Sequence, residues 1–292
     1  MKFIYRALIS IVIILFSKDL IANEKMALLE AVSKNLVSFT VEKSPQAYNE
    51  KGLTMKLNNK SSKQLIIIID PALIFGAADS SYQNLIILGN EIVNIAPKQT
   101  KNVLIQTYCG NSDKLAPDKN IQYSYKYQAD SNLIKTLIFI KKNQVSNTLA
   151  QSAVWFFTDS FPNLNDIYQY SQQEKSKLLV TFICDLLHVP YPEYFFEKSI
   201  ETTPHQVVSS PVILQLSVDI KWEQANKTLL SLSIFNDKNA KIESYFELKE
   251  MKAGRYELHA SFKTSAYPKG NYTVRLYNNK NETIKEIKVP LK

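Results

Sequence analysis

Cysteine, histidine and glycine are scarce in this chain of 292 residues, and each shortage argues against a class of site. Two Cys are too few for a disulfide-dense scaffold or a four-cysteine zinc site. The three His, which are His188, His205 and His259, show no metal-ligand spacing. Six Gly leave few places where backbone N–H groups could cradle a phosphate. We therefore expect neither a metal nor a cofactor.

Familiar catalytic motifs are also missing. The sequence has no G-x-S-x-G elbow, no H-E-x-x-H pair, no G-x-G-x-x-G turn and no P-loop. Asp159 with Asp166, and Asp185 with Glu193, can be grouped as carboxylate pairs, but a chain with 27 Asp+Glu produces such pairs by chance. The sequence predicts a protein that is not an enzyme, and a hydrolase with an unrecognised site is the alternative.

The chain also lacks an apolar run long enough to span a bilayer. Lys2 and Arg6 precede a largely apolar run of 10 residues, Ala7–Phe16, and Leu20–Ala22 ends in a small residue. This order is typical of a secretory signal peptide, here residues 1–22. We expect an exported protein of the periplasm, cell surface or medium, without a transmembrane span after cleavage. An uncleaved N-terminal anchor is the alternative.

Positive charge is in modest excess, with a net charge of +8. Cleavage after residue 22 would remove three positive charges and one negative charge and leave +6. The excess is spread along the chain, with no basic run longer than two residues. Nucleic-acid binding requires a basic stripe on one face, so we expect no nucleic-acid partner.

Short runs rich in Val, Ile, Leu and Tyr, separated by turn residues, dominate the first half of the chain. They are Leu36–Val41, Leu53–Leu57, Gln64–Ile69, Leu85–Leu88, Glu91–Ile95, Asn102–Tyr108 and Gln122–Tyr127. Helical spacing follows at 146–158, where Ser146 or Asn147 is a candidate N-cap, and at 171–188, where Ser171 and Glu174 match a capping box. Residues 132–142 fit a strand or a helix.

A polar Ser/Thr/Pro-rich segment, 199–211, predicts a linker, and only strand patterns follow it. We therefore predict a signal peptide (1–22), a β-sandwich with a helical extension (23–198), a linker and an Ig-like β-sandwich (212–292). The predicted fold class is mainly β with a helical insertion: an N-terminal antiparallel β-sandwich with packed helices, plus a C-terminal Ig-like β-sandwich.

The C-terminal segment resembles small Ig-like modules of secreted bacterial proteins. Strand Leu230–Phe235 leads into the turn Asn236–Asn239, a Gly-aromatic strand begins at Ala253–Tyr256, and Lys269–Leu276 reads K-G-N-Y-T-V-R-L. Flagellar-hook-capping-like and type IX sorting domains share this pattern. The turn departs from it, with Asn239 where Gly is usual. The resemblance covers about a quarter of the chain and implies an Ig-like fold.

A second resemblance is to bacterial thioester domains, which carry an aromatic-Cys motif and a downstream helix with a Gln-x-x-apolar-Trp motif. Here Tyr108-Cys109 is followed by Gln151, 42 residues after the Cys, and then by Trp155. The resemblance implies a Cys109–Gln151 thioester, shielded by Trp155, that would couple covalently to an amine on a partner. Similar Q-x-A-V-W-x-x-T-D arrangements occur in secreted bacterial proteins of unassigned function, which this chain most resembles.

Structural alternatives for these residues stay open. Tyr108 and Trp155 also fit an ordinary core, and Gln151 could hydrogen-bond a strand end. Cys109 could instead form a disulfide with Cys184, because export favours oxidation, or both could be buried thiols.

An aromatic-rich segment around two prolines is a candidate binding patch for a protein or glycan, or the seal of a core. Its members are Tyr191, Tyr194, Phe195 and Phe196. The sequence thus predicts an exported, non-enzymatic binding or adhesion protein of the bacterial envelope. The alternative is a thioester protein that attaches covalently to a partner surface.

Overall fold

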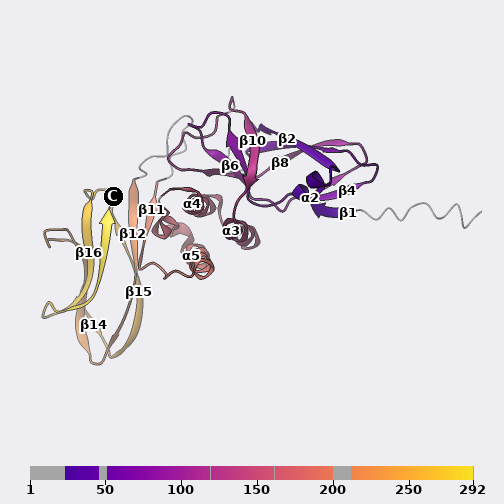
Figure 1. The fold of residues 1–292 in the computed structure, drawn as a ribbon. Coiled ribbons are helices and arrows are strands. Elements are labelled where there is room, and N and C mark those ends of the chain that lie inside the picture. The colour runs from indigo at the N-terminus through magenta and orange to yellow at the C-terminus, as the bar shows by residue number, and fades with distance from the viewer. Residues whose placement is uncertain (1–23, 46–50, 119, 161, 200–211, 292) are drawn as a thin grey trace, which may run out of the picture.

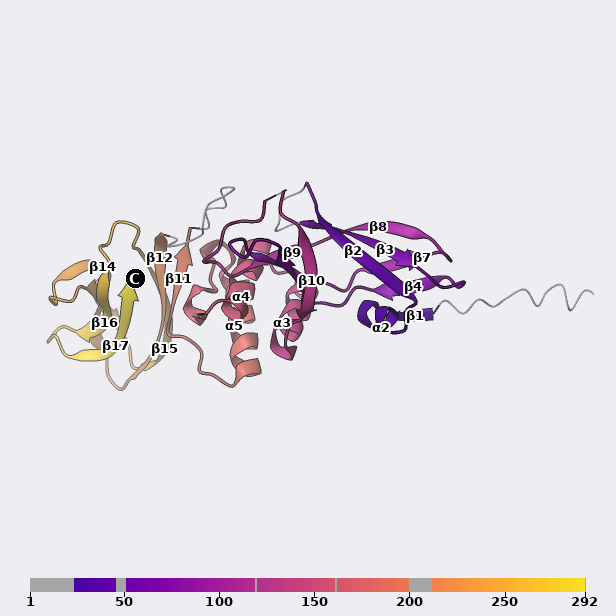
Figure 2. The same ribbon diagram turned by 45° about the horizontal axis from the view of Figure 1, so that its top comes forward.

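The computed structural model describes residues 24–45, 51–118, 120–160, 162–199 and 212–291 (Figure 1). The predicted signal peptide and nearly all of the predicted linker lie outside the described residues. The chain is mainly β with a helical insertion, which confirms the predicted fold class. Figures 1 and 2 show helices between an N-terminal group of sheets and a C-terminal sandwich.

The N-terminal part consists of three small sheets with the strand orders β1-β4-β7, β2-β3-β8 and β10-β5-β6-β9. Their strands are β1 (Glu24–Ala27), β2 (Val37–Lys43), β3 (Leu53–Asn59), β4 (Leu65–Ile68), β5 (Leu73–Ala77), β6 (Asn84–Ile87), β7 (Ile92–Ile95), β8 (Thr100–Ile105), β9 (Thr107–Gly110) and β10 (Tyr123–Gln128). The pairing is antiparallel except between β1 and β4, which run parallel. Apolar side chains of these sheets bury one another in an N-terminal core.

The helices form a second core against one face of β5, β6 and β9. The helices of this core are α3 (Ser131–Lys142), α4 (Asn147–Thr158) and α5 (Gln173–Leu187), and the 3-10 turns η1 (Leu164–Asp166) and η2 (Tyr170–Gln172) lie between α4 and α5. A further helix, α2 (Leu28–Ser33), packs on the N-terminal sheets. The ambiguous segment 132–142 is thus helical, and the side chain of Asp130 caps it. Ser146 caps α4 as predicted, whereas α5 begins after Gln172 without a side-chain cap, so the proposed Ser171–Glu174 capping box is not used.

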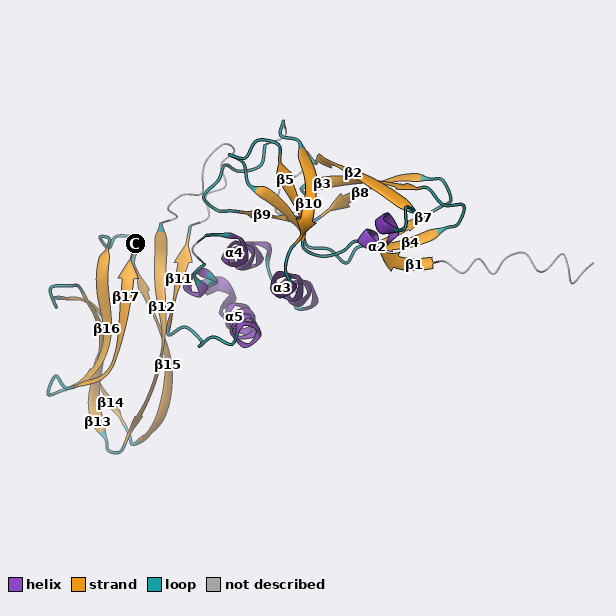
Figure 3. Ribbon diagram, in the orientation of Figure 1, coloured by secondary structure: helices purple, strands orange, loops and turns teal. Residues whose placement is uncertain are grey.

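The C-terminal part is a sandwich of two antiparallel sheets with strand orders β11-β12-β15 and β14-β13-β16-β17 (Figure 3). Its strands are β11 (Tyr194–Lys198), β12 (Ile213–Gln224), β13 (Thr228–Phe235), β14 (Lys241–Met251), β15 (Gly254–Lys263), β16 (Gly270–Asn278) and β17 (Thr283–Leu291). Side chains from both sheets form a third core.

Strand β11 joins the helical layer to the sandwich. It precedes the predicted linker in the chain, yet it pairs with β12 along Tyr194–Lys198. Neighbouring side chains of a strand point to opposite faces. Phe195 therefore belongs to the helical core, whereas Phe196 belongs to the core of the sandwich. The C-terminal sheet thus begins before residue 199, with a strand that sequence analysis grouped with the N-terminal domain.

Candidate functional site

Gln151 and Cys109, the candidate thioester residues, are in contact. The Gln151 Oε1 atom accepts a hydrogen bond from the backbone N–H of Cys109 at 2.9 Å, and its Nε2 donates to the Cys109 carbonyl at 2.7 Å. Both residues are buried. Because β9 is the last strand of its sheet, no further strand of the described residues pairs with the outward N–H and C=O of Cys109. The Gln151 amide forms the two hydrogen bonds that such a strand would make.

The Cys109 side chain lies on the face of β9 that is turned away from the helices. Tyr108 belongs to the helical core, and Cys109, the next residue, belongs to the N-terminal core. Burial raises the pKa of the Cys109 thiol well above its usual value, although the charge of Lys43 acts in the opposite direction. The Gln151 amide is therefore hydrogen-bonded to the backbone of Cys109, and the thiol is protonated and buried among apolar side chains.

The other residues of this motif have contacts of their own. Trp155 is part-buried and its indole N–H donates to Gln83 Oε1 at 3.4 Å. Tyr108 is buried in the helical core, where desolvation raises its pKa to about 12. Cys184 and Cys109 are both free thiols, so the structure contains no disulfide between them. Cys184 lies in the helical core and its Sγ contacts the Pro190 carbonyl at 3.7 Å.

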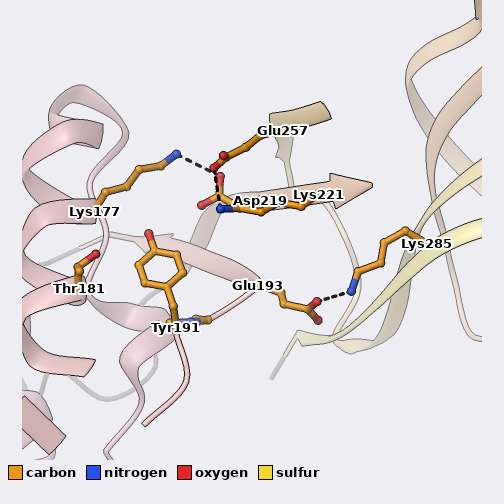
Figure 4. Close-up of a pocket in the computed structure, with 9 residues that line it drawn as sticks. Lys177, Thr181, Tyr191, Glu193, Asp219, Lys221, Glu257 and Lys285 are labelled. Carbon is orange, nitrogen blue, oxygen red and sulfur yellow. Dashed lines mark hydrogen bonds and ion pairs between the residues drawn. The ribbon is translucent and has the colours of Figure 1, made fainter. Parts of the chain in front are cut away.

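The aromatic segment divides between core and surface. Phe195 and Phe196 are buried, Tyr194 is half-buried, and 37% of Tyr191 is exposed. The Tyr191 ring packs edge-on against Phe195, with 5.5 Å between ring centroids. Tyr191 lines a cavity (Figure 4).

This cavity has a volume of about 510 Å³ and lies between α5 and the C-terminal sandwich. We call it the interlayer cavity. Its walls come from distant parts of the chain: Lys177 and Thr181 of α5, Tyr191 to Glu193 before β11, Asp219 and Lys221 of β12, Glu257 of β15, and Lys285 of β17.

Charged side chains line the interlayer cavity in three pairs (Figure 4). Lys177 pairs with Asp219 at 3.2 Å, Lys221 pairs with Glu257 at 3.2 Å, and Lys285 pairs with Glu193. The lining therefore carries three ammonium groups and three carboxylates, and its formal charges balance. The Lys177–Asp219 pair is the most buried, with 8% of the Asp219 side chain exposed.

Asp219 is also the first member of a chain of hydrogen bonds that continues through His259 to Tyr168. His259 Nδ1 lies 2.7 Å from the same Asp219 oxygen, and His259 Nε2 lies 3.0 Å from the Tyr168 hydroxyl. Burial raises the pKa of Asp219, but the hydrogen bond from His259 and the charge of Lys177 outweigh it, so the pKa is lowered overall. Burial raises the pKa of Tyr168 to about 12. This chain joins the helical layer to β12 and β15.

Sequence reasoning missed the interlayer cavity, apart from Tyr191. In β12, Leu216, Val218 and Ile220 are buried and polar residues lie between them. That pattern predicts a solvated outer face, but α5 covers part of it. Glu193, grouped with Asp185 from the sequence, instead pairs with Lys285 across the cavity.

The described ranges contain neither a cluster of metal ligands nor a membrane-spanning helix. No three His, Cys, Asp or Glu side chains there come together as metal ligands. None of the helices in the same ranges has both the length and the apolar composition to cross a membrane. No protein-family model matches this sequence, and no curated protein matches it either.

Proposed function

We propose that the protein is an exported, non-enzymatic binding protein of the bacterial envelope, and that its ligand occupies the interlayer cavity. The observation that carries this proposal is the cavity itself. It has a volume of about 510 Å³, lies at the junction of two packed layers, and combines one aromatic ring with fixed polar groups. Ligand sites commonly have this size and lie at such junctions.

The chemistry of the lining favours binding over catalysis. Each carboxylate that lines the cavity is paired with a lysine. The lowered pKa of Asp219 makes this carboxylate a weak base. The lining residues include no Ser, Cys or His, so a Ser–His or Cys–His pair is missing from this cavity.

Export is tested by fractionating the native cells and sequencing the N-terminus of the protein. We expect a mature chain that begins near Asn23 and lies outside the cytoplasm, because a charged start precedes an apolar run. Ile13→Asp interrupts that run and should leave the full chain in the cytosol. A wild-type chain that retains Met1 in the cytosolic fraction would contradict export.

Ligand binding in the cavity is tested by blocking it. Thr181 is an exposed residue of α5 that lines the cavity, so Thr181→Trp should fill the space without disturbing a core. The small-molecule fraction of a native envelope extract should raise the melting temperature of wild-type protein, since a ligand at a hundred times its Kd stabilises by about 2.7 kcal/mol. Thr181→Trp should lose this shift.

A matched control separates blocking from a general effect of a new surface tryptophan. Ile138 is an exposed residue of α3, 43% accessible, and it does not line the interlayer cavity. Ile138→Trp should keep the full thermal shift. If Thr181→Trp keeps it as well, the ligand binds elsewhere and the cavity is not the site.

A further inference from the structure

The charged groups that line the interlayer cavity balance one another. Its three ammonium groups and three carboxylates are already paired at close range. An anion entering the cavity would meet three carboxylates beside the three ammonium groups, and a cation would meet three ammonium groups beside the three carboxylates, so the lining offers neither a net attraction. A ligand without net charge requires no such attraction.

The same lining suits hydroxyl groups. A carboxylate only accepts hydrogen bonds, and a lysine ammonium only donates them. A hydroxyl does both, so it can donate to Glu193 or Glu257 and accept from Lys285 or Lys221 while these pairs persist. Thr181 adds a further hydroxyl to the wall. A ligand with many hydroxyls therefore matches the alternation of donors and acceptors around the cavity.

Tyr191 supplies a flat apolar surface beside these polar groups. Phe195 supports its ring from one side at 5.5 Å between centroids, and Pro192 follows it in the lining. Figure 4 shows the Tyr191 ring extending into the space between α5 and β12. The C–H bonds on one face of a sugar ring carry slight positive charge and pack well on the negative face of an aromatic ring.

We propose that the ligand of the interlayer cavity is a short uncharged oligosaccharide, with one sugar ring stacked on Tyr191 and its hydroxyls bound by the surrounding ion pairs. This inference rests on the proposed binding function and specifies the ligand class. The volume of about 510 Å³ falls within the range of small-molecule sites and leaves room for more than a single small polar group.

The test measures binding of trisaccharides to the full mature chain by isothermal titration calorimetry. The neutral probes are chitotriose, cellotriose, maltotriose and mannotriose; the charged probes are the glucosamine trimer and trigalacturonic acid. At least one neutral probe should bind, and both charged probes should bind more weakly than it does. Because the ligand is neutral, its affinity should change by less than about twofold between low and high salt.

Variants of one side chain assign the stacking role. Tyr191→Ala should weaken binding of the best neutral probe about tenfold, which is the expected loss of an aromatic contact. Tyr191→Phe keeps the ring and should bind within about threefold of wild type. Tyr245→Ala removes a tyrosine of β14 that is 46% exposed and outside the cavity, and it should have no effect.

Three results would overturn the proposal. A charged trimer that binds more tightly than every neutral one contradicts the charge argument, and an unchanged affinity in Tyr191→Ala contradicts the stacking role. The third result is that no neutral probe binds, while an envelope extract still stabilises wild type but not Thr181→Trp. It would reject a sugar as the ligand and leave the binding function in place. Failure of both assays rejects the binding function as well.

Discussion

Replacing Gln151 with alanine is expected to lower the free energy of unfolding by about 3 kcal/mol, because the change leaves a buried N–H and a buried C=O of Cys109 unpaired. Each unpaired buried group costs about 1–3 kcal/mol, and the removed side chain leaves a cavity as well. Denaturant unfolding followed by circular dichroism measures the loss.

Two controls separate the hydrogen bonds from packing. Gln151→Met keeps most of the volume and loses both hydrogen bonds, so it should be nearly as destabilising as Gln151→Ala. Cys109→Ala keeps the backbone groups and removes one buried atom, which should cost only about 1 kcal/mol. A Gln151→Met variant as stable as wild type would show that the hydrogen bonds contribute little.

The intact mass of the mature protein tests the thioester prediction in the same samples. A Cys109–Gln151 thioester would lack ammonia and weigh about 17 Da less than the sequence requires. The hydrogen bonds of Gln151 to the Cys109 backbone, and the thiol on the opposite face of β9, lead us to expect the full mass. A deficit of that size, abolished by Cys109→Ala, would establish the thioester instead.

The second large effect is expected at Asp219. Asp219→Ala removes the carboxylate that binds both Lys177 of α5 and His259 of β15. Removing one partner of a largely buried ion pair costs about 3 kcal/mol. Lys177 and His259 Nδ1 would lose their shared partner, with 29% and 18% of these side chains exposed. For comparison, Glu257→Ala breaks a pair whose side chains are 71% and 59% exposed, and it should cost less than about 1 kcal/mol.

The contribution of Asp219 should also depend on pH. Its pKa is lower in the folded protein than in the unfolded chain, so the unfolded state takes up its proton first as the pH falls. The stability it provides is complete above the unfolded pKa of about 4 and is lost at more acidic pH. Unfolding free energies of wild type and Asp219→Asn should therefore differ at pH 7 and converge as the pH falls through the folded pKa of Asp219. A difference independent of pH would mean that Asp219 acts without its charge.

Local patterns in the sequence predicted much of the fold. Most strands of the two β-rich parts, and the Ser146 cap of α4, follow from residue type and spacing within a few positions. The contact between Gln151 and Cys109 was also predictable as a pair. Which atoms of Cys109 take part was not, because strand register decides whether the backbone or the side chain faces α4.

The interlayer cavity could not be predicted, because every contact that builds it is distant in the sequence. Lys177 and Asp219 are 42 residues apart, and Asp219 and His259 are 40 apart. Strand β11 was missed for a related reason. Tyr194–Lys198 follows two prolines, and its pairing partner β12 lies beyond the predicted linker, so a local pattern cannot distinguish it from a loop.

The position of β11 restricts where the length of this chain can vary. Phe195 and Phe196 enter opposite cores only because they occupy odd and even positions of one paired strand. Inserting or deleting one residue inside this strand would turn the remaining side chains over, and both cores would lose a phenylalanine together. Insertions and deletions that accumulate during evolution should therefore avoid Tyr194–Lys198, even though a predicted linker follows immediately.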